Sequence, residues 1–456
     1  MEKGNKKIIR GWVFYDWANS VYNLVISSAI FPLFYDFKTK AAFIKADQHL
    51  GDNVSSETIQ TLVKEIPEGT YIPVNFFGWE FSSSVLYSFV LSLSFLVVSF
   101  LSPLLSGVAD YSGSKKKFLK FFCYLGAFSC MSLYFFDTDH IEFGFLSVFL
   151  ASIGFWNSLV FYNAFLPEIA EVKDHDKISS KGFTMGYFGS MLLLIICLIW
   201  MKVFNYPTAW CFVFVGIWWI GFSQITYRVL PNNVYNKKPE KGVLWRGFKE
   251  LKLVFKDFRK TKRLKKYLYA FFFFNTGVQT VMLMATIFAN KEIAWPNDSG
   301  TTGLIIAILL IQILGAAGAF IMSKVSAKIG NINTLIISVS IWILICLAAF
   351  IVKTPVEFYI LASSVGLVMG GVQAIARSTY SKFLPETTDH ASYFSFYDAT
   401  EKIGIVLGTL FFGMVEMWTG SIRYSIISVA LFFVLGLIML FLVPKNEVEI
   451  EFSKDN

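Results

Sequence analysis

Residues 165–168 read Phe-Leu-Pro-Glu at the end of one long apolar segment, and residues 383–386 repeat these four at the end of another, 218 positions later. Further landmarks recur at nearly the same offset: Ser106, Val108 and Gly113 as Ser323, Val325 and Gly330, and Gly186 as Gly404. Matches at one fixed offset indicate an internal duplication. The chain is therefore predicted to contain two structurally equivalent halves.

The composition is that of a membrane protein. Of the 456 residues, 55% are hydrophobic and 16% are charged, whereas soluble domains are about one quarter charged. Twelve apolar segments are long enough to cross roughly 30 Å of hydrocarbon, and they begin near residues 12, 81, 118, 143, 181, 209, 267, 302, 333, 356, 392 and 422. Because six spans separate equivalent landmarks, both halves have the same orientation, as in facilitator-type transporters. The predicted fold is all-α, with twelve transmembrane helices in two parallel six-helix repeats.

The distribution of positive charge predicts the orientation in the membrane. Thirty of the 40 Lys and Arg residues fall in segments on the same side as the N-terminus. By the positive-inside rule, both termini are expected in the cytoplasm. The predicted domains are an N-terminal half over residues 1–230, a linker over 231–266 and a C-terminal half over 267–456. An irregular, partly helical outer loop is expected at 36–80.

The linker has the pattern of a basic amphipathic helix. Between residues 240 and 262, aromatic and aliphatic residues recur every three to four positions, with Lys and Arg between them. Such a helix is expected to lie flat on anionic lipids of the inner leaflet. A solvated linker between the halves and a partner-binding basic helix are the alternatives.

Three motifs resemble those of a known family. Residues 15–20 read Tyr-Asp-Trp-Ala-Asn-Ser, residues 161–168 read Phe-Tyr-Asn-Ala-Phe-Leu-Pro-Glu, and residues 370–378 read Gly-Gly-Val-Gln-Ala-Ile-Ala-Arg-Ser. The chain resembles the major facilitator superfamily and, within it, the branch named for the vacuolar effluxers of autophagy and their bacterial relatives. The resemblance implies transport without ATP, and for the vacuolar members export of amino acids. It also implies the cytoplasmic (inner) membrane of a bacterium as the location.

The loop at residues 106–117 is similar to the superfamily signature between spans two and three. The resemblance makes Asp110, Gly113, Lys115 and Lys116 a predicted conformational latch. The loop departs from the signature at three positions, Ser106, Tyr111 and Ser114.

Polar residues inside apolar spans are functional candidates, because an ionisable group in hydrocarbon is costly unless it faces a cavity or a partner. In span one, Asp16, Asn19, Asn23 and Ser27 follow a helical period and are predicted to share one water-lined face. The alternative for Asp16 is a capping or snorkelling carboxylate near the cytoplasmic end.

Polar candidates also occur in spans four, seven and ten. Gln373 and Arg377 lie one turn apart in span ten, and Arg presents a planar fork suited to a carboxylate or phosphate. Arg377 is therefore the main candidate for contact with the solute, and an ion pair with an acid of span eleven is its alternative. Asn275 and Gln279 in span seven, with Asn157 in span four, complete the predicted substrate-binding residues.

Span eleven contains three ionisable residues, Asp398, Glu401 and Lys402. Asp398 and Lys402 are four residues apart and can neutralise each other, which leaves Glu401 unmatched. A carboxyl in a low dielectric has a raised pKa, the property that proton coupling requires. Asp16, Asp398 and Glu401 are the predicted proton-coupling candidates, and a hydrated cluster at the cytoplasmic mouth is the alternative.

The sequence lacks the motifs of several enzyme classes. It has no phosphate-binding G-x-x-x-x-G-K-[ST], no H-E-x-x-H and no G-x-S-x-G. The protein is therefore not expected to be an enzyme, and no cofactor, metal site or nucleic-acid partner is predicted.

A secondary transporter is predicted instead, which carries a small zwitterionic or anionic solute such as an amino acid by alternating access, with protons as the coupling ion. The alternatives are a transporter of sugars or drug-like molecules and, from another class, a membrane receptor or scaffold without transport.

Overall fold

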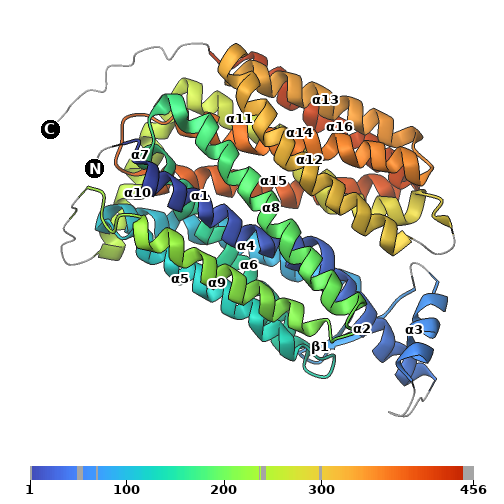
Figure 1. Cartoon of the computed structure of the whole chain (residues 1–456). Coiled ribbons are helices and arrows are strands. Elements are labelled where there is room, and N and C mark those ends of the chain that lie inside the picture. The colour runs from blue at the N-terminus through green and yellow to red at the C-terminus, as the bar shows by residue number, and fades with distance from the viewer. Residues whose placement is uncertain are drawn as a thin grey trace.

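The computed structural model describes residues 3–48, 55–67, 70–235, 237, 243–296 and 300–444. Within them, twelve helices are long and apolar enough to cross a membrane. They confirm the twelve predicted spans, and the protein is an integral, multi-pass membrane protein. Figure 1 shows the first six spans and the last six as two groups of helices side by side.

The spans of the first half are formed by α1 (Lys6–Val21), η1 (Tyr22–Ala29), α2 (Ile30–Asp47), α4 (Ser83–Ser112), α5 (Lys115–Ser132), η2 (Leu133–Phe135), α6 (Ile141–Asn163), α7 (Leu166–Ile169), η3 (Val172–Asp174), α8 (His175–Lys202) and α9 (Ala209–Val229). The spans of the second half are formed by α11 (Lys262–Glu292), α12 (Gly300–Ile329), α13 (Asn331–Ile351), α14 (Pro355–Lys382), α15 (His390–Thr419) and α16 (Ile422–Phe441). The face of the bundle where α1 begins and α16 ends is called the terminal face below.

The repeated glycines occupy equivalent helix contacts in the two halves. A side chain at Gly186 of α8 would collide with Ser20 of α1, and a Cβ at Gly404 of α15 would lie 2.5 Å from Thr276 Oγ1 of α11. Both glycines therefore allow close packing of a half's fifth span against its first, as expected for small residues at helix interfaces in membranes.

The other repeated landmarks share a positive φ at glycine but differ in environment. Gly113 and Gly330, in the loops after spans two and eight, have φ values of +66° and +84°, in a region that favours glycine. Glu168, from the first Phe-Leu-Pro-Glu motif, is buried, whereas Glu386 from the second is exposed. The two halves are thus equivalent in fold and different in chemistry.

The outer loop is more ordered than predicted. It contains the end of α2, the helix α3 (Ser56–Glu65) and an antiparallel hairpin of β1 (Pro73–Phe76) and β2 (Trp79–Ser82). The backbone N–H of Phe77 at the hairpin turn donates to Glu142 of α6 over 2.9 Å. The hairpin is the one departure from an all-α fold among the described residues. Figure 1 shows α3 projecting from the bundle far from the terminal face.

Residues 243–260 of the linker form α10 (Val243–Lys260), which lies against α4. The helix α11 begins at Lys262, inside the predicted linker. The guanidinium of Arg246 donates to the Tyr111 hydroxyl of α4 over 3.1 Å. The rings of Phe255 and Phe258 lie 5.8 and 5.7 Å from that of Phe396 on α15. The helix therefore contacts both halves. The sequence pattern did not predict that its apolar face packs against the protein. Residues 240–242 of the predicted lipid-binding segment lie outside the described residues.

Close backbone contact holds α10 against α4, and we expect Gly247→Leu to displace the helix. A Cβ at Gly247 would lie 2.7 Å from the Val108 backbone, so a leucine requires α10 to move. The expected result is faster trypsin cleavage within residues 243–260 in detergent. Gly221→Leu is the matched control, because Gly221 has open space around it. Equal cleavage of both variants would contradict the contact.

Candidate solute-binding site

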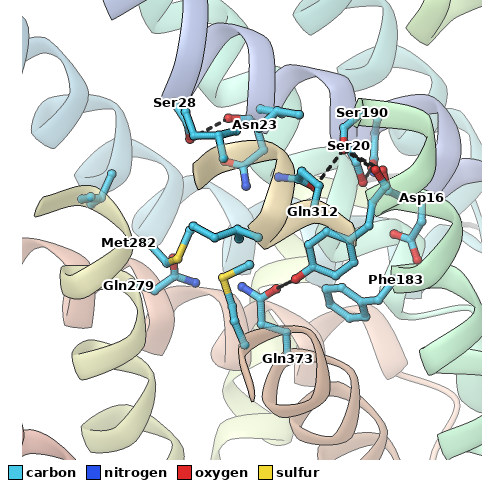
Figure 2. Close-up of a pocket in the computed structure, with 18 of the residues that line it drawn as sticks. Asp16, Ser20, Asn23, Ser28, Phe183, Ser190, Gln279, Met282, Gln312 and Gln373 are labelled. Carbon is cyan, nitrogen blue, oxygen red and sulfur yellow. Dashed lines mark hydrogen bonds between the residues drawn. The ribbon is translucent and has the colours of Figure 1, made fainter. Parts of the chain in front are cut away.

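A cavity of about 240 Å³ lies between the two halves. It has room for on the order of ten or more water molecules. Figure 2 shows polar side chains from several helices converging on it. Seven of the eight predicted substrate-binding residues line it: Asp16, Asn19, Asn23, Asn275, Gln279, Gln373 and Arg377.

The eighth predicted residue, Asn157, is not among the residues that line the cavity. Its side chain accepts a hydrogen bond from Ser102 of α4 over 2.9 Å and donates to the Ile153 carbonyl over 3.0 Å. The first contact joins α4 to α6, and the second lies within α6. Asn157 therefore stabilises the wall of the site in this conformation.

Span one changes its helical period where it borders the cavity. Residues 22–29 form a π-helix, a feature that often marks functional sites. The wider turn alters which side chains share the inward face. Asn19 and Asn23 line the cavity as predicted, but Ser28 lines it in place of Ser27, so the predicted four-residue face is wrong at its last member.

Arg377 and Asp16 form a buried ion pair at the cavity. Nη2 of the guanidinium lies 3.0 Å from Asp16 Oδ2, and Nη1 lies 3.4 Å from Oδ1. The remaining N–H groups donate to the Ser179 hydroxyl and carbonyl, both over 2.9 Å, and to Asn163 over 3.3 Å. A guanidinium has five N–H donors, and here each has a protein acceptor. The ion-pair alternative for Arg377 matches this geometry, with its acid in span one instead of span eleven.

Aromatic side chains surround this ion pair. The Tyr162 hydroxyl donates to Asp16 Oδ2 over 2.9 Å. The Arg377 guanidinium carbon lies 4.3 Å from the ring centre of Phe183 and 5.0 Å from that of Trp12. Cation–π contacts of this kind stabilise a desolvated guanidinium. Asp16 therefore lies inside the bundle. The alternative interpretation of this residue was a capping or snorkelling carboxylate near the cytoplasmic end of span one.

A second charged cluster lies on α15. Lys402 Nζ is 3.1 Å from Asp398 Oδ1 and 3.7 Å from Glu401 Oε2, and it sits 3.4 Å from the ring centre of Trp156. Glu401 Oε1 accepts from Gln279 over 2.8 Å. Among these three ionisable groups of α15, Glu401 lines the cavity and the other two lie behind it.

Several amide groups at the cavity remain available to a solute. Within the described part of the chain, the side-chain nitrogens of Asn19 and Asn275 are buried and lack an acceptor. An unpaired buried donor is costly, so a solute oxygen that accepts from either one is favoured. These two amides are therefore candidates for contact with a polar solute.

Other polar residues of the site were not predicted from the sequence. Tyr187 of α8 donates to Gln373 over 3.1 Å, and Ser190 donates to Gln312 of α12 over 3.3 Å. Gln312 could have been found as a lone amide in an apolar span. Asn163 and Ser179 offered no such signal, because both lie near span ends where polar residues are common.

The predicted latch lies at the terminal face. The Asp110 carboxylate accepts the backbone N–H groups of Ala391 and Ser392, over 3.2 and 2.7 Å, at the start of α15. A carboxylate is favoured there because a helix N-terminus carries unpaired N–H groups and a positive dipole end. Lys115 forms an ion pair with Glu168. Lys116 instead donates to the Leu230 carbonyl over 2.6 Å, within the first half.

A second contact joins the halves at the same face. Asp176, at the start of α8, lies 2.6 Å from Lys382 Nζ and accepts from Asn331 over 2.7 Å. Together with Asp16–Arg377 and Asp110–α15, it places charged contacts between the halves below the cavity. In this conformation the halves are held together on the terminal side.

Two parallel six-helix repeats around a polar central cavity define a transporter of the major facilitator superfamily. The chain is 28% identical over 456 residues to the uncharacterized MFS-type transporter YxiO of Bacillus subtilis (strain 168), with 98% of this chain and 97% of that protein covered. It is 24% identical to autophagy-related protein 22 of Vanderwaltozyma polyspora, over 97% of this chain and 91% of that one.

A model of the family described as vacuole effluxer Atg22-like matches residues 4–451, and the chain belongs to this family. Among solved structures, the proton:xylose symporter XylE has the same fold, with a TM-score of 0.66, 12% sequence identity, and 96% of this chain and 95% of that one covered. The family and fold are those of transporters and not of enzymes. The resemblance read from the three sequence motifs is thereby confirmed.

Proposed function

We propose that the protein moves a small polar solute of the amino-acid type by alternating access, coupled to protons. The observation that carries the proposal is the cavity between the halves with its unused donors on Asn19 and Asn275. Amide groups suit the carbonyl or carboxylate oxygens of such a solute, and Glu401 suits its ammonium group or a proton. The aliphatic part of the lining suits a modest apolar side chain.

In this mechanism, the ion pair of Asp16 and Arg377 closes the terminal side of the cavity. Separating the two charges is costly unless water or the solute replaces the lost partner of each. Inward opening requires the pair, the Asp110 cap and the Asp176 contact to separate. The role of Arg377 is therefore to close the path in this state, and its direct contact with the solute belongs to a state in which Asp16 has moved.

A cavity-filling substitution tests the proposal. Ala285 lines the cavity, and Ala285→Trp is expected to abolish solute-induced thermal stabilisation and reduce flux in proteoliposomes at least tenfold. The purified protein would be screened against amino acids, peptides, sugars and nucleosides, since a ligand stabilises the state that it binds. Leu431→Trp, at an exposed position of α16, is the matched control. Undiminished stabilisation and flux in Ala285→Trp would remove the cavity from the transport path.

The same screen separates the alternative solutes. The amides and Trp156 at the cavity also suit a neutral sugar, and stabilisation by sugars alone would favour that class. Absence of flux for every solute in the screen would instead favour a receptor or scaffold.

We further propose that the membrane is the cytoplasmic membrane of a bacterium, with the terminal face in the cytoplasm and the basic side of α10 near anionic lipid headgroups. The excess of Lys and Arg on that face supports this orientation. Accessibility of single introduced cysteines in intact cells tests it: Lys173→Cys should be protected and Val203→Cys labelled.

A further inference from the structure

The ionisable groups at the cavity and directly behind it do not balance. Among the described residues there, Asp16, Asp398 and Glu401 are acidic, and Arg377 and Lys402 are basic. Unbalanced charge in a desolvated site is costly. This part of the bundle therefore lacks one positive charge when all five groups are ionised.

The unbalanced charge belongs to Glu401. Arg377 directs two of its nitrogens to Asp16, so this pair is neutral. Lys402 is closer to Asp398 than to Glu401, at 3.1 Å against 3.7 Å. Glu401 also reaches the cavity, where the neutral amide of Gln279 is its hydrogen-bond donor. A cation that enters the cavity therefore meets the carboxylate of Glu401.

We propose that the solute carries a net charge of +1 and pairs a protonated amine with the Glu401 carboxylate. This inference rests on the proposed function and specifies its solute class: a small amine with one positive charge and no carboxylate, such as an amino-acid amide. The free amides of Asn19 and Asn275 accommodate the oxygens of the solute. In this conformation a free carboxylate finds no matching cation, because every N–H of Arg377 already has an acceptor.

The same carboxylate holds a proton when the solute is absent. As the ammonium of the solute arrives, Glu401 releases its proton to water and the ammonium takes its place, so the charge of the site is conserved. Exchange of one cation for one proton keeps the site neutral in both states, which is the favourable condition in a low dielectric. Transport of the solute is then coupled to proton movement in the opposite direction.

The other titratable groups around Glu401 come from four helices. They are Asp398, Lys402 and Tyr397 of α15, Asp16 of α1, Tyr187 of α8 and Arg377 of α14. Asp398 and Lys402 pair with each other, as do Asp16 and Arg377. The Tyr187 hydroxyl donates to Gln373, and the Tyr397 ring stacks on Phe271. The exchange of a proton for the ammonium group of the solute is therefore assigned to Glu401.

Three probes that share the valine skeleton test the charge class: valinamide, a monocation; valine, a zwitterion; and N-acetylvaline, an anion. Their side chain suits the aliphatic lining from Leu24, Met282 and Ile308. Calorimetric titration of the purified full chain, in two buffers of different ionisation enthalpy, measures affinity and proton release together. We expect valinamide to bind roughly ten- to a hundredfold more tightly than valine, because valine offers the same ammonium to Glu401 but leaves its carboxylate without a cation. Its binding should weaken as pH falls and release about one proton.

Glu401→Gln is expected to remove both the preference for valinamide and the proton release. Glu386→Gln, an exposed residue of the terminal face, should retain both. Tighter binding of valine or N-acetylvaline, or unchanged proton release in Glu401→Gln, would overturn the inference and leave the proposed transport function standing. If none of the three probes bound, the inference about the charge of the solute would also be overturned. The proposed transport function has its own test: it fails if no solute in the broader screen is transported.

Discussion

Replacing Arg377 with alanine is expected to cause the largest loss of stability of any single substitution at the cavity. The change leaves Asp16 buried beside Tyr162 without its cation. Removing one partner of a buried ion pair costs about 3–5 kcal/mol. Thermal unfolding in detergent should show a clearly lowered midpoint, and flux in proteoliposomes should be lost. Arg377→Lys should also lose flux, because an ammonium cannot reproduce five directed N–H bonds.

The double variant Asp16→Asn with Arg377→Gln tests whether the loss comes from the unpaired charge. Removing both charges should recover most of the stability, because the uncompensated carboxylate is gone. Lys291→Ala is the matched control: its ion pair with Glu416 is exposed, and such pairs contribute about 1 kcal/mol or less. If the double variant were as unstable as Arg377→Ala, the loss of stability would not come from the unpaired carboxylate of Asp16.

The second large effect is expected from Asp110→Ala, which should open the terminal side. The substitution removes the acceptor of two backbone N–H groups at the start of α15. Hydrogen bonds to a charged group contribute about 1.5–3 kcal/mol, so the balance between the two conformations should shift roughly ten- to a hundredfold. In vesicles of known orientation, a membrane-impermeant maleimide added on the terminal side should label Leu159→Cys faster in this background.

Asp389→Ala provides the control, because Asp389 precedes α15 but pairs with Lys237 of the linker. It should leave labelling at Leu159→Cys unchanged. The five native cysteines are buried and unpaired, so the introduced cysteine is the main reactive thiol. If both aspartate substitutions increased the labelling rate equally, the cause would be the loss of negative charge near α15 and not the loss of the latch.

Hydropathy and the duplicated motifs predicted the fold because each rests on a local rule. Span length follows from the bilayer thickness, and the repeat is visible as a constant offset. The inward face of span one was predicted correctly for Asp16, Asn19 and Asn23 because the α-helical period holds that far. It failed at Ser27 because the π-helix at residues 22–29 depends on packing that the sequence pattern does not encode.

The pairing of charges could not be predicted in the same way. Asp16 and Arg377 are 361 positions apart, and the ion-pair partner expected for Arg377 was an acid of span eleven. The cavity around them depends on how the halves approach each other. Similarly, the amphipathic pattern of α10 predicted an apolar face but not that Phe396 of α15 lies against it.

Distances across the two faces of the bundle test the central claim, alternating access around the cavity, most directly. Spin labels at Lys173 and Asn333 report on the terminal face, and labels at Val203 and Val356 report on the opposite face; all four positions are exposed. When Asp110→Ala is introduced, the first distance should lengthen and the second should shorten. Two unchanged distances, or two that change in the same direction, would contradict the account.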